Sequence, residues 1–503
     1  MPSLYDTNTL RAIEARELAR LAPLALMQRA AAALTDTLTD LARARPARSP
    51  ILSLIGPGNN GADALLASLE LRRRGFDVRA VLMSPGMPSA ADARAAHARA
   101  HSGGLPMSDT LPAQALDGAL VIDGLFGIGL SRPIEGRAAD WVAALNRSRS
   151  AVVAVDVPSG IHADTGAVVG GAAGVAVRAA VTVTFLGDKP GLHTGAGRVH
   201  AGQVRVDTLQ VETGPGQGTL ITRREGLALA APLARQPDSH KGSHGHVAVL
   251  GGAPGLRGAA VLAALGAQRS GAGKVSLGTP DGWQPDSGQH PNLMSLAARQ
   301  RPPDIDVWVV GCGLGQTRES RKALQALLAN PSVPQVIDAD ALNLVAQDSS
   351  VARAFRYGSQ PRVLTPHPLE AARLLGTTTA VIQSDRIAAA LRLAARFGSV
   401  VVLKGAGTVC ADPAGHWAIV APGSAALATA GTGDVLAGVI GGLIAQGLPA
   451  ASAACLGSFV HACAGERAAA LRAGTIGMAA SELPVLIADE LNALVSPTRA
   501  GFP

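Results

Sequence analysis

The segment ILSLIGPGNNGAD, residues 51–63, sets a pattern that recurs along the chain. Residues 51–55 are almost all apolar and predict a buried strand, and a glycine-rich turn then leads into a helical segment over residues 62–74. Glycines at such a junction let the backbone approach a ligand closely, and a helix N-terminus favours anionic groups. A tight turn with Asp63 as an ordinary helix cap explains the same residues equally well.

The alternation of strand and helix continues on both sides of a turn-rich break near residue 220. Strand-like runs before the break lie at residues 78–83, 119–122, 151–155 and 181–185. Runs after it lie at residues 246–251, 307–310, 336–337, 362–364 and 400–403. Alternation of this kind predicts parallel sheets with helices on both faces. We therefore expect two different α/β domains, residues 1–220 and 221–503.

The composition excludes several classes of protein. Hydrophobic residues make up 48% and charged residues 16% of the 503 residues, so the chain is not disordered. Its 59 glycines follow no fixed period, which excludes collagen. Aromatic residues are scarce and the net charge of +7 comes from scattered arginines, so we expect no nucleic-acid partner.

The cysteines and the longest uncharged stretch indicate the cellular compartment of the protein and whether the chain spans a membrane. The four cysteines form no CxxC pair and no secretory signal opens the chain, which predicts free thiols in the cytoplasm. Residues 435–465 carry no Asp, Glu, Lys or Arg, but glycines, serines and Pro449 interrupt them. We expect two buried helices joined near residues 447–449 rather than a membrane span.

Two polar loops of the first half follow predicted strands, at residues 123–132 and 156–162. An Asp directly after an apolar strand is partly desolvated, which raises its pKa and suits proton transfer. Asn60, Asp123 and Ser159 together offer only oxygen ligands and one formal charge, which suits a hard, weakly charged cation and argues against zinc. Capping or turn roles remain the alternative for each Asp.

The first half resembles the NAD(P)H-hydrate epimerase family over residues 7–212, through the motifs GPGNNGAD, DGLFGIGLSRPIEG, VDVPSGIHADTG and TVTFLGDKPGLHTGAG. The resemblance implies a Rossmann-like three-layer αβα sandwich that interconverts the R and S forms of hydrated NADH and NADPH. It also implies a potassium ion on Asn60, Asp123 and Ser159, and Asp156 as the catalytic acid/base. The implied substrate-binding residues are Asn59, Asn60, Gly61, Ala62, Asp63, Gly127, Ile128, Gly129, Leu130, Ser131, Arg132, Pro133 and Asp156.

This half departs from the family pattern at two places. The family usually has NNGGDG, where this chain has Ala62 and Ala64, and Leu-Met-Glu, where it has Gln28 after Met27. These departures bear on the efficiency of epimerisation rather than on the fold.

The sharpest feature of the second half is ATAGTGD, residues 428–434, which opens a helix. Consecutive glycine N–H groups at a helix N-terminus form an anion hole, and Asp434 can act as base toward a hydroxyl that is phosphorylated or lost. A simple helix cap by Asp434 is the alternative. The loop KGAGT, residues 404–408, combines a cation, flexible backbone and a hydroxyl, although it is not a Walker A motif.

Three further polar residues of this half follow predicted strands. His367 lies between two prolines, which fix its backbone and could present its side chain to a ligand, although a lone loop histidine is more often structural. Asp338 and Asp340 either organise a site or cap the next helix.

Residues 225–490 resemble the ADP-dependent NAD(P)H-hydrate dehydratase family, which has a ribokinase-like fold, through SHKGSHGHVAVLGGAPG, GCGLG, VIDADALN, VLTPHPLEAARLLG, VVLKGAGTV and LATAGTGDVLAGVIGGLIAQG. The resemblance implies that Asp434 activates the C6 hydroxyl of the hydrate for phosphorylation by ADP, which acts with Mg²⁺. The implied hydrate-binding residues are Ala259, Gly313, His367 and Asp434. The implied nucleotide-binding residues are Lys404, Gly405, Ala406, Gly407, Thr408 and Gly433. Departures at Cys312, Ser424 and Ala430 are mild.

Together the two resemblances imply a bifunctional enzyme of metabolite repair that is both isomerase and lyase. Its partners would be NADHX, NADPHX and ADP, with no nucleic acid and no membrane, and the chain would form a cytoplasmic homo-oligomer. The alternative is a ribokinase-type small-molecule kinase that carries a non-catalytic N-terminal binding domain. The motif VLTPHPLE and the attached first half argue against the kinase.

Overall fold

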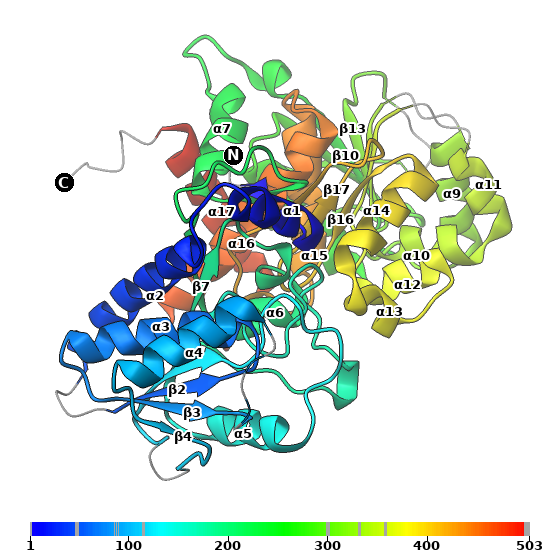
Figure 1. Ribbon diagram of the computed structural model, residues 1–503. Helices are drawn as coiled ribbons and strands as arrows, with labels where there is room; N and C mark the ends of the chain where they lie inside the picture. The colour runs from blue at the N-terminus through cyan, green and yellow to red at the C-terminus, as the bar shows by residue number, and fades with distance from the viewer. Residues whose placement is uncertain are drawn as a thin grey trace. The chain divides into compact units, whose positions relative to one another are not determined.

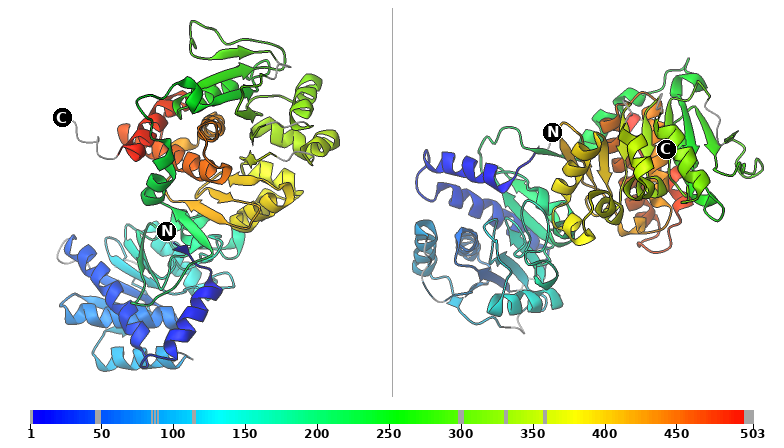
Figure 2. Two further views of the ribbon diagram at one scale, coloured as in Figure 1. Left: turned by 90° about the horizontal axis from the view of Figure 1, so that it is seen from above. Right: turned by 90° about the vertical axis from the view of Figure 1, so that its right-hand side faces the viewer.

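The computed structural model describes residues 3–45, 50–84, 86, 88, 90–112, 116–297, 302–329, 333–356 and 360–496. Contacts between Cα atoms divide the chain into two compact units, which meet in sequence between Thr219 and Leu220. Both units combine a sheet with packed helices, as Figures 1 and 2 show. The predicted α/β class is therefore confirmed.

The N-terminal unit contains a seven-stranded sheet in the order β4-β3-β2-β5-β6-β7-β8, and every pairing in it is parallel. The strands are β2 (Ile51–Ile55), β3 (Val78–Leu82), β4 (Met107–Ser108), β5 (Leu120–Gly124), β6 (Ala151–Val155), β7 (Val181–Phe185) and β8 (Gln203–Asp207). The helices are α1 (Thr7–Leu18), α2 (Ala25–Arg43), α3 (Asn59–Arg73), α4 (Ala91–Ser102), α5 (Gly136–Arg147) and α6 (Gly195–His200).

Alternate residues of these strands face two separate cores. Ile51 and Ile55 of β2 pack with α2, α3 and α4, whereas Leu52 and Leu54 pack with α5 on the other face. Figure 1 shows these helices on opposite sides of the sheet, which gives the predicted three layers.

The C-terminal unit contains a mixed sheet whose strands run β18-β17-β16-β15-β14-β13-β10-β11-β12. Its strands are β10 (His246–Leu250), β11 (Lys274–Gly278), β12 (Met294–Leu296), β13 (Val307–Val310), β14 (Gln335–Ile337), β15 (Arg362–Leu364), β16 (Val400–Leu403), β17 (Val409–Ala411) and β18 (Trp417–Val420). Pairing is parallel from β16 to β12, and β17 and β18 add an antiparallel hairpin edge.

Two sets of helices cover this second sheet. A large apolar core joins one face of the sheet to α8 (Arg257–Arg269), α15 (Thr432–Ala445), α16 (Ala450–Leu471) and α17 (Leu483–Val495). Helix α7 (Arg223–Ala230) also packs on this core, and the remaining helices are α9 (Arg318–Ala329), α10 (Ala339–Gln347), α11 (Ser349–Arg356), α12 (Pro368–Leu375), α13 (Thr379–Ser384) and α14 (Arg386–Phe397). Two short strands, β1 (Ser3–Leu4) and β9 (Gly218–Ile221), complete the assignment.

The structure confirms one predicted pair of helices and divides another predicted helical segment into two. The uncharged residues 435–465 form most of α15 and α16, which are separated near Gly447 and Pro449 as predicted. Within the described ranges, no helix is long and apolar enough to cross a bilayer. The helical pattern that starts at Thr7 is broken into α1 and α2, because Pro23 disfavours helical backbone in the residue before it and Leu24 adopts a φ of 64°.

Helices α8 and α15 pack backbone against backbone through small residues. A Cβ atom on Gly438 would lie 1.9 Å from the Ala263 carbonyl oxygen, and one on Gly266 would lie 2.4 Å from that of Val435. This close contact fixes the N-terminal end of α15, where Asp434 lies.

We expect Gly438→Ala to lower the stability of the C-terminal unit by about 1–3 kcal/mol, because the added methyl group must push the two helices apart. Gly258→Ala in the same helix pair is the matched control, since its Cβ would meet open space. Calorimetric unfolding of both variants measures the difference. Equal unfolding temperatures for the two variants would show that the helices can separate at no cost.

Candidate active sites

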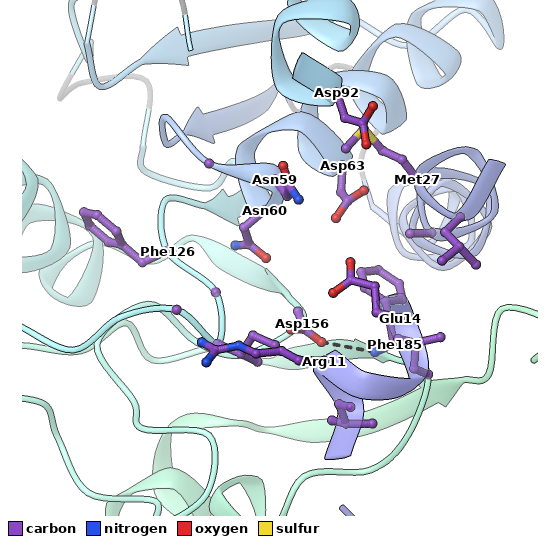
Figure 3. A pocket seen from close by; sticks show the side chains of 18 of the residues that line it. Arg11, Glu14, Met27, Asn59, Asn60, Asp63, Asp92, Phe126, Asp156 and Phe185 are labelled. Atoms are coloured by element: carbon purple, nitrogen blue, oxygen red, sulfur yellow. Dashed lines mark hydrogen bonds between the residues drawn. The ribbon is translucent and has the colours of Figure 1, made fainter. Parts of the chain in front are cut away.

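The N-terminal unit has a pocket of about 540 Å³ at the carboxyl ends of its central strands (Figure 3). The loops after β2, β5, β6 and β7 line it, and these four strands are consecutive neighbours in the sheet. Helices α1 and α2 supply further lining residues. Ligand sites of open parallel sheets lie at this edge, so the pocket is the candidate site of the unit.

Most of the residues predicted for this site line the pocket. They are Asn59, Asn60, Asp63, Gly127, Ile128, Gly129, Leu130, Ser131, Arg132 and Asp156. Gly61, Ala62 and Pro133 do not line it. Ala62 is 2% exposed, and a Cβ on Gly61 would lie 2.1 Å from the Gly56 carbonyl oxygen, so these two residues shape the turn beneath the pocket. The methyl group of Ala62 therefore does not narrow the pocket directly.

A buried lysine holds Asp156 in a strained position. Asp156 has a φ of 66°, and its Oδ1 atom lies 2.7 Å from Nζ of Lys189, which is 1% exposed. The Thr184 hydroxyl and the Phe185 N–H also donate to Oδ1, each at 3.2 Å. These contacts engage one carboxylate oxygen and fix the direction of the side chain.

Several lining residues escaped the sequence analysis. They are Arg11, Glu14, Asp92, Phe185 and Lys189. Lys189 carried a signal, since it lies in the quoted motif GDKPGLHTGAG and lysine is rare in this chain. Arg11 and Glu14 carried none, because only the tertiary structure brings α1 over the strand ends.

Four carboxyl groups line this pocket from different elements, and Figure 3 shows those of Glu14, Asp63, Asp92 and Asp156. Burial raises the pKa of Glu14, and the negative charge of Asp156 raises it further. Burial likewise raises the pKa of Asp63 well above its usual value, with Asp156 and then Glu14 adding to the effect. The pocket can therefore hold protonated and ionised carboxyl groups side by side.

The predicted cation ligands lie together beneath the loop after β5. Asp123 is fully buried and accepts hydrogen bonds from the Ser159 N–H at 2.8 Å and the Ser159 hydroxyl at 2.6 Å. Burial raises the pKa of Asp123 to about 6. The Asn60 amide is also buried, and its Nδ2 atom has no hydrogen-bond partner within the described part of the chain. The Asp123 carboxylate, the Ser159 hydroxyl and the Asn60 amide oxygen, rather than its Nδ2 donor, are oxygen ligands of the kind that fit a hard monovalent cation.

Asp434 lies in the first turn of α15, beside a second lysine–aspartate pair, in which the aspartate is buried. Lys404 Nζ lies 2.7 Å from Asp338 Oδ1, and a Cβ on Gly433 would lie 3.2 Å from the same Nζ. The Sγ atom of Cys312 and one carboxylate oxygen each of Asp338 and Asp434 all lie within 4.8 Å of one another. Burial raises the pKa of Asp434 to about 7, and the charge of Asp338 adds to this effect. Asp434 can therefore take up a proton near neutral pH.

The predicted nucleotide loop connects β16 to β17. Lys404 points inward to Asp338, whereas Gly405 and Ala406 are exposed. The buried Arg386 donates to the carbonyl oxygens of Leu403 and Lys404 and so supports the loop from below. The structure thus brings the loop, Gly433 and Asp434 together.

The predicted hydrate ligands occupy two places around Asp434. A Cβ on Gly313 would lie 3.0 Å from that of Ala259, so these residues are neighbours. His367 is the N-cap of α12: its Nδ1 accepts from the Leu369 and Glu370 N–H groups, and its Nε2 lies 3.3 Å from a Glu370 carboxylate oxygen. Its ring nitrogens thus have partners within the protein, although the side chain remains 45% exposed.

Each unit therefore carries polar loops, a close lysine–aspartate pair and a further pocket or neighbouring carboxyl group at the carboxyl ends of parallel strands, which is the arrangement of an α/β enzyme with two sites. Residues 247–488 match the model of the NAD(P)H-hydrate dehydratase family. Residues 23–191 match the model described as the YjeF-related protein N-terminus.

Relatives span the whole chain or its second half. A bifunctional NAD(P)H-hydrate repair enzyme of Coxiella burnetii is 36% identical over 99% of this chain and 100% of its own length. The enzyme of the same name from Escherichia coli is 39% identical over 86% of this chain and 83% of its own. An ADP-dependent (S)-NAD(P)H-hydrate dehydratase of Neisseria meningitidis is 46% identical over 49% of this chain and 87% of its own.

The crystal structure of a Bacillus subtilis ADP/ATP-dependent NAD(P)H-hydrate dehydratase, co-crystallised with ATP and Mg²⁺, is 28% identical and covers 55% of this chain and 99% of that chain, with a TM-score of 0.48. The two family models and the full-length relatives agree on the order of the two parts. The chain belongs to the family of bifunctional NAD(P)H-hydrate repair enzymes.

Replacing Lys189 with Met should destabilise the N-terminal unit by about 3 kcal/mol, because it leaves the Asp156 carboxylate without its cation. Adding Asp156→Asn should recover part of the loss, since the buried negative charge is then also removed. Urea unfolding of the two variants measures both steps, and Lys322→Met, at an exposed position on α9, is the control. A double variant no more stable than Lys189→Met alone would show that the pair is not coupled.

Proposed function

We propose that the N-terminal unit interconverts the R and S forms of hydrated NADH and NADPH, and that the C-terminal unit converts the S form back to NAD(P)H at the expense of ADP. The observation that carries the proposal is the presence of both sites, in the family's order, in one chain. Water addition to the nicotinamide ring yields two epimers, and a dehydratase that accepts one of them repairs the whole pool only with an epimerase.

In the first activity the loops 59–63 and 127–133 bind the hydrated dinucleotide, and Asp156 transfers protons at the nicotinamide ring. Because Asp156 Oδ1 is engaged by Lys189, its other oxygen is left for the substrate. Asn60, Asp123 and Ser159 would hold a potassium ion, which supplies positive charge next to the substrate loop.

In the second activity Asp434 accepts the proton of the C6 hydroxyl while the hydroxyl oxygen attacks the terminal phosphorus of ADP and AMP leaves. Loss of phosphate and of a ring proton then restores the double bond. Residues 404–408 and Gly433 bind the nucleotide, whose Mg²⁺ neutralises charge on the phosphates. Ala259, Gly313 and His367 surround the hydrate.

The assignment gives residues 1–220 to the epimerase and residues 221–503 to the dehydratase, in a cytoplasmic homo-oligomer. Incubation of the purified chain with mixed hydrates, ADP, Mg²⁺ and K⁺ tests both activities at once. Both epimers should disappear as reduced nicotinamide forms, and persistence of the R form at its spontaneous rate would refute the epimerase. Light scattering on the same preparation tests the oligomeric state.

Asp434→Asn should abolish ADP-dependent recovery of NAD(P)H, because the variant cannot take up the hydroxyl proton. In the wild-type protein, kcat/KM should fall about tenfold for each pH unit below 7, since the pKa of Asp434 is raised to about 7 and the base works only when ionised. Asp489→Asn, on the exposed side of α17, is the matched control. A pH profile that stays flat between pH 5.5 and 7 would exclude Asp434 as the base.

Asp123→Asn should remove the potassium stimulation of epimerisation and leave dehydration of the S form unchanged, because the substitution removes the one formal charge of the cation site. Titration of the rate with KCl, against tetramethylammonium chloride at equal ionic strength, measures the effect. Asp117→Asn is the control, since Asp117 lies exposed just before β5. Unchanged potassium dependence in Asp123→Asn would place the cation elsewhere.

A further inference from the structure

The proposed epimerisation needs a proton donor that Asp156 does not supply. A hydroxyl leaves the ring carbon readily only when it is protonated and departs as water. Asp156 faces the ammonium group of Lys189 at 2.7 Å and accepts two further hydrogen bonds on the same oxygen, so it is suited to receive a proton rather than to give one. A second group on the pocket wall must therefore act as the acid.

We propose that Glu14, on helix α1, is the general acid of the N-terminal site and works as a pair with Asp156. Glu14 lines the pocket, and Figure 3 shows its carboxyl group in the cavity between those of Asp63 and Asp156. The inference rests on the proposed epimerase function and names the residue that function still requires.

The charges around Glu14 favour a protonated carboxyl group. It is half-buried, and the groups that face it are Arg11 on its own helix, Asp63 on α3, Asp92 on α4, Asp156 after β6 and Lys189 after β7. Burial and the Asp156 charge raise its pKa, and Lys189 and Arg11 lower it in part. Two carboxyl groups in one pocket, one paired with a cation and one not, are the arrangement in which acid and base roles separate.

The proposed step uses both groups. The Glu14 carboxyl gives its proton to the C6 hydroxyl as the C6–O bond breaks, and the bonding electron pair leaves with the water. The lone pair of the ring nitrogen N1 forms a double bond to C6. A water molecule then adds to the other face of C6 and gives a proton to the Asp156 carboxylate. Proton exchange with solvent returns Glu14 to the acid and Asp156 to the carboxylate.

The test measures conversion of R-NADHX to the S form by the full chain, in water enriched in oxygen-18. Wild-type protein should incorporate one labelled oxygen at C6 for each epimerisation. Glu14→Gln should lower kcat for both epimerisation and label uptake about 100-fold or more, with little change in KM, because the amide keeps the shape but cannot donate an acidic proton. Glu14→Asp should restore part of the rate.

Three controls separate the role proposed for Glu14 from a general effect of changing α1, from misfolding and from the same role at Asp63. Glu17→Gln, on the same helix and not lining the pocket, should leave epimerisation unchanged. Dehydration of S-NADHX with ADP should be unchanged in Glu14→Gln, which shows that the C-terminal unit is folded, and an unchanged urea unfolding curve shows the same for the N-terminal unit. Asp63→Asn should retain more activity than Glu14→Gln.

The outcomes distinguish the inference from the proposed function. Full epimerisation by Glu14→Gln, a larger loss in Asp63→Asn than in Glu14→Gln, or epimerisation without label uptake would each overturn the role of Glu14. Absence of epimerisation by the wild-type chain would instead overturn the proposed function of the N-terminal unit.

Discussion

Direct contact between backbone atoms at the strand-end glycines is the constraint on which both sites depend. A Cβ on Gly56 would lie 1.8 Å from the Leu125 carbonyl oxygen, and one on Gly311 would lie 1.9 Å from that of Asp338. The first contact draws the loop after β2 onto the loop after β5, which brings Asn60 close to the Asp123 loop. The second draws the loop after β13 onto the start of α10, which brings Cys312 beside Asp338. Any side chain at either glycine would separate the polar groups that each site assembles.

The two sites share one electrostatic device and use it differently. Each has a lysine 2.7 Å from an aspartate, Lys189 with Asp156 and Lys404 with Asp338, and in each pair one partner is buried. In the N-terminal unit the paired aspartate itself faces the pocket. In the C-terminal unit the pair stands behind Asp434, and burial with the Asp338 charge raises the pKa of Asp434 to about 7. Lys189 thus orients the carboxylate that faces the pocket, whereas Lys404 pairs with Asp338, the neighbour of Asp434.

The strands and the loops that follow them could be predicted from local sequence, because an apolar run followed by glycine or Asp is a pattern contained within about ten residues. Asp156 belongs to such a signal and directly follows β6, whereas Asp434 belongs to a glycine motif that opens α15. Arg11 and Glu14 were not predicted from the sequence as site residues. The sequence of α1 has the pattern of an ordinary surface helix, and no local feature indicates that this helix lines a pocket. His367 carried only part of its signal in the flanking prolines: the Glu three residues later also makes it the partner in a capping box, a role that was not predicted from the sequence.

The rarity of lysine gives the buried pair at Asp156 a further meaning. Only five of the 44 basic residues are lysine, so arginine has taken nearly every position where a positive charge alone is wanted. Lys189 donates to the Thr184 hydroxyl and to the carbonyl oxygens of Phe185 and Gly187 while it pairs with Asp156. A compact tetrahedral ammonium can meet partners arranged around a point, but a planar guanidinium cannot. Although the chain otherwise prefers arginine, it has lysine at this position because the shape of the cation, and not its charge alone, determines whether the site can form.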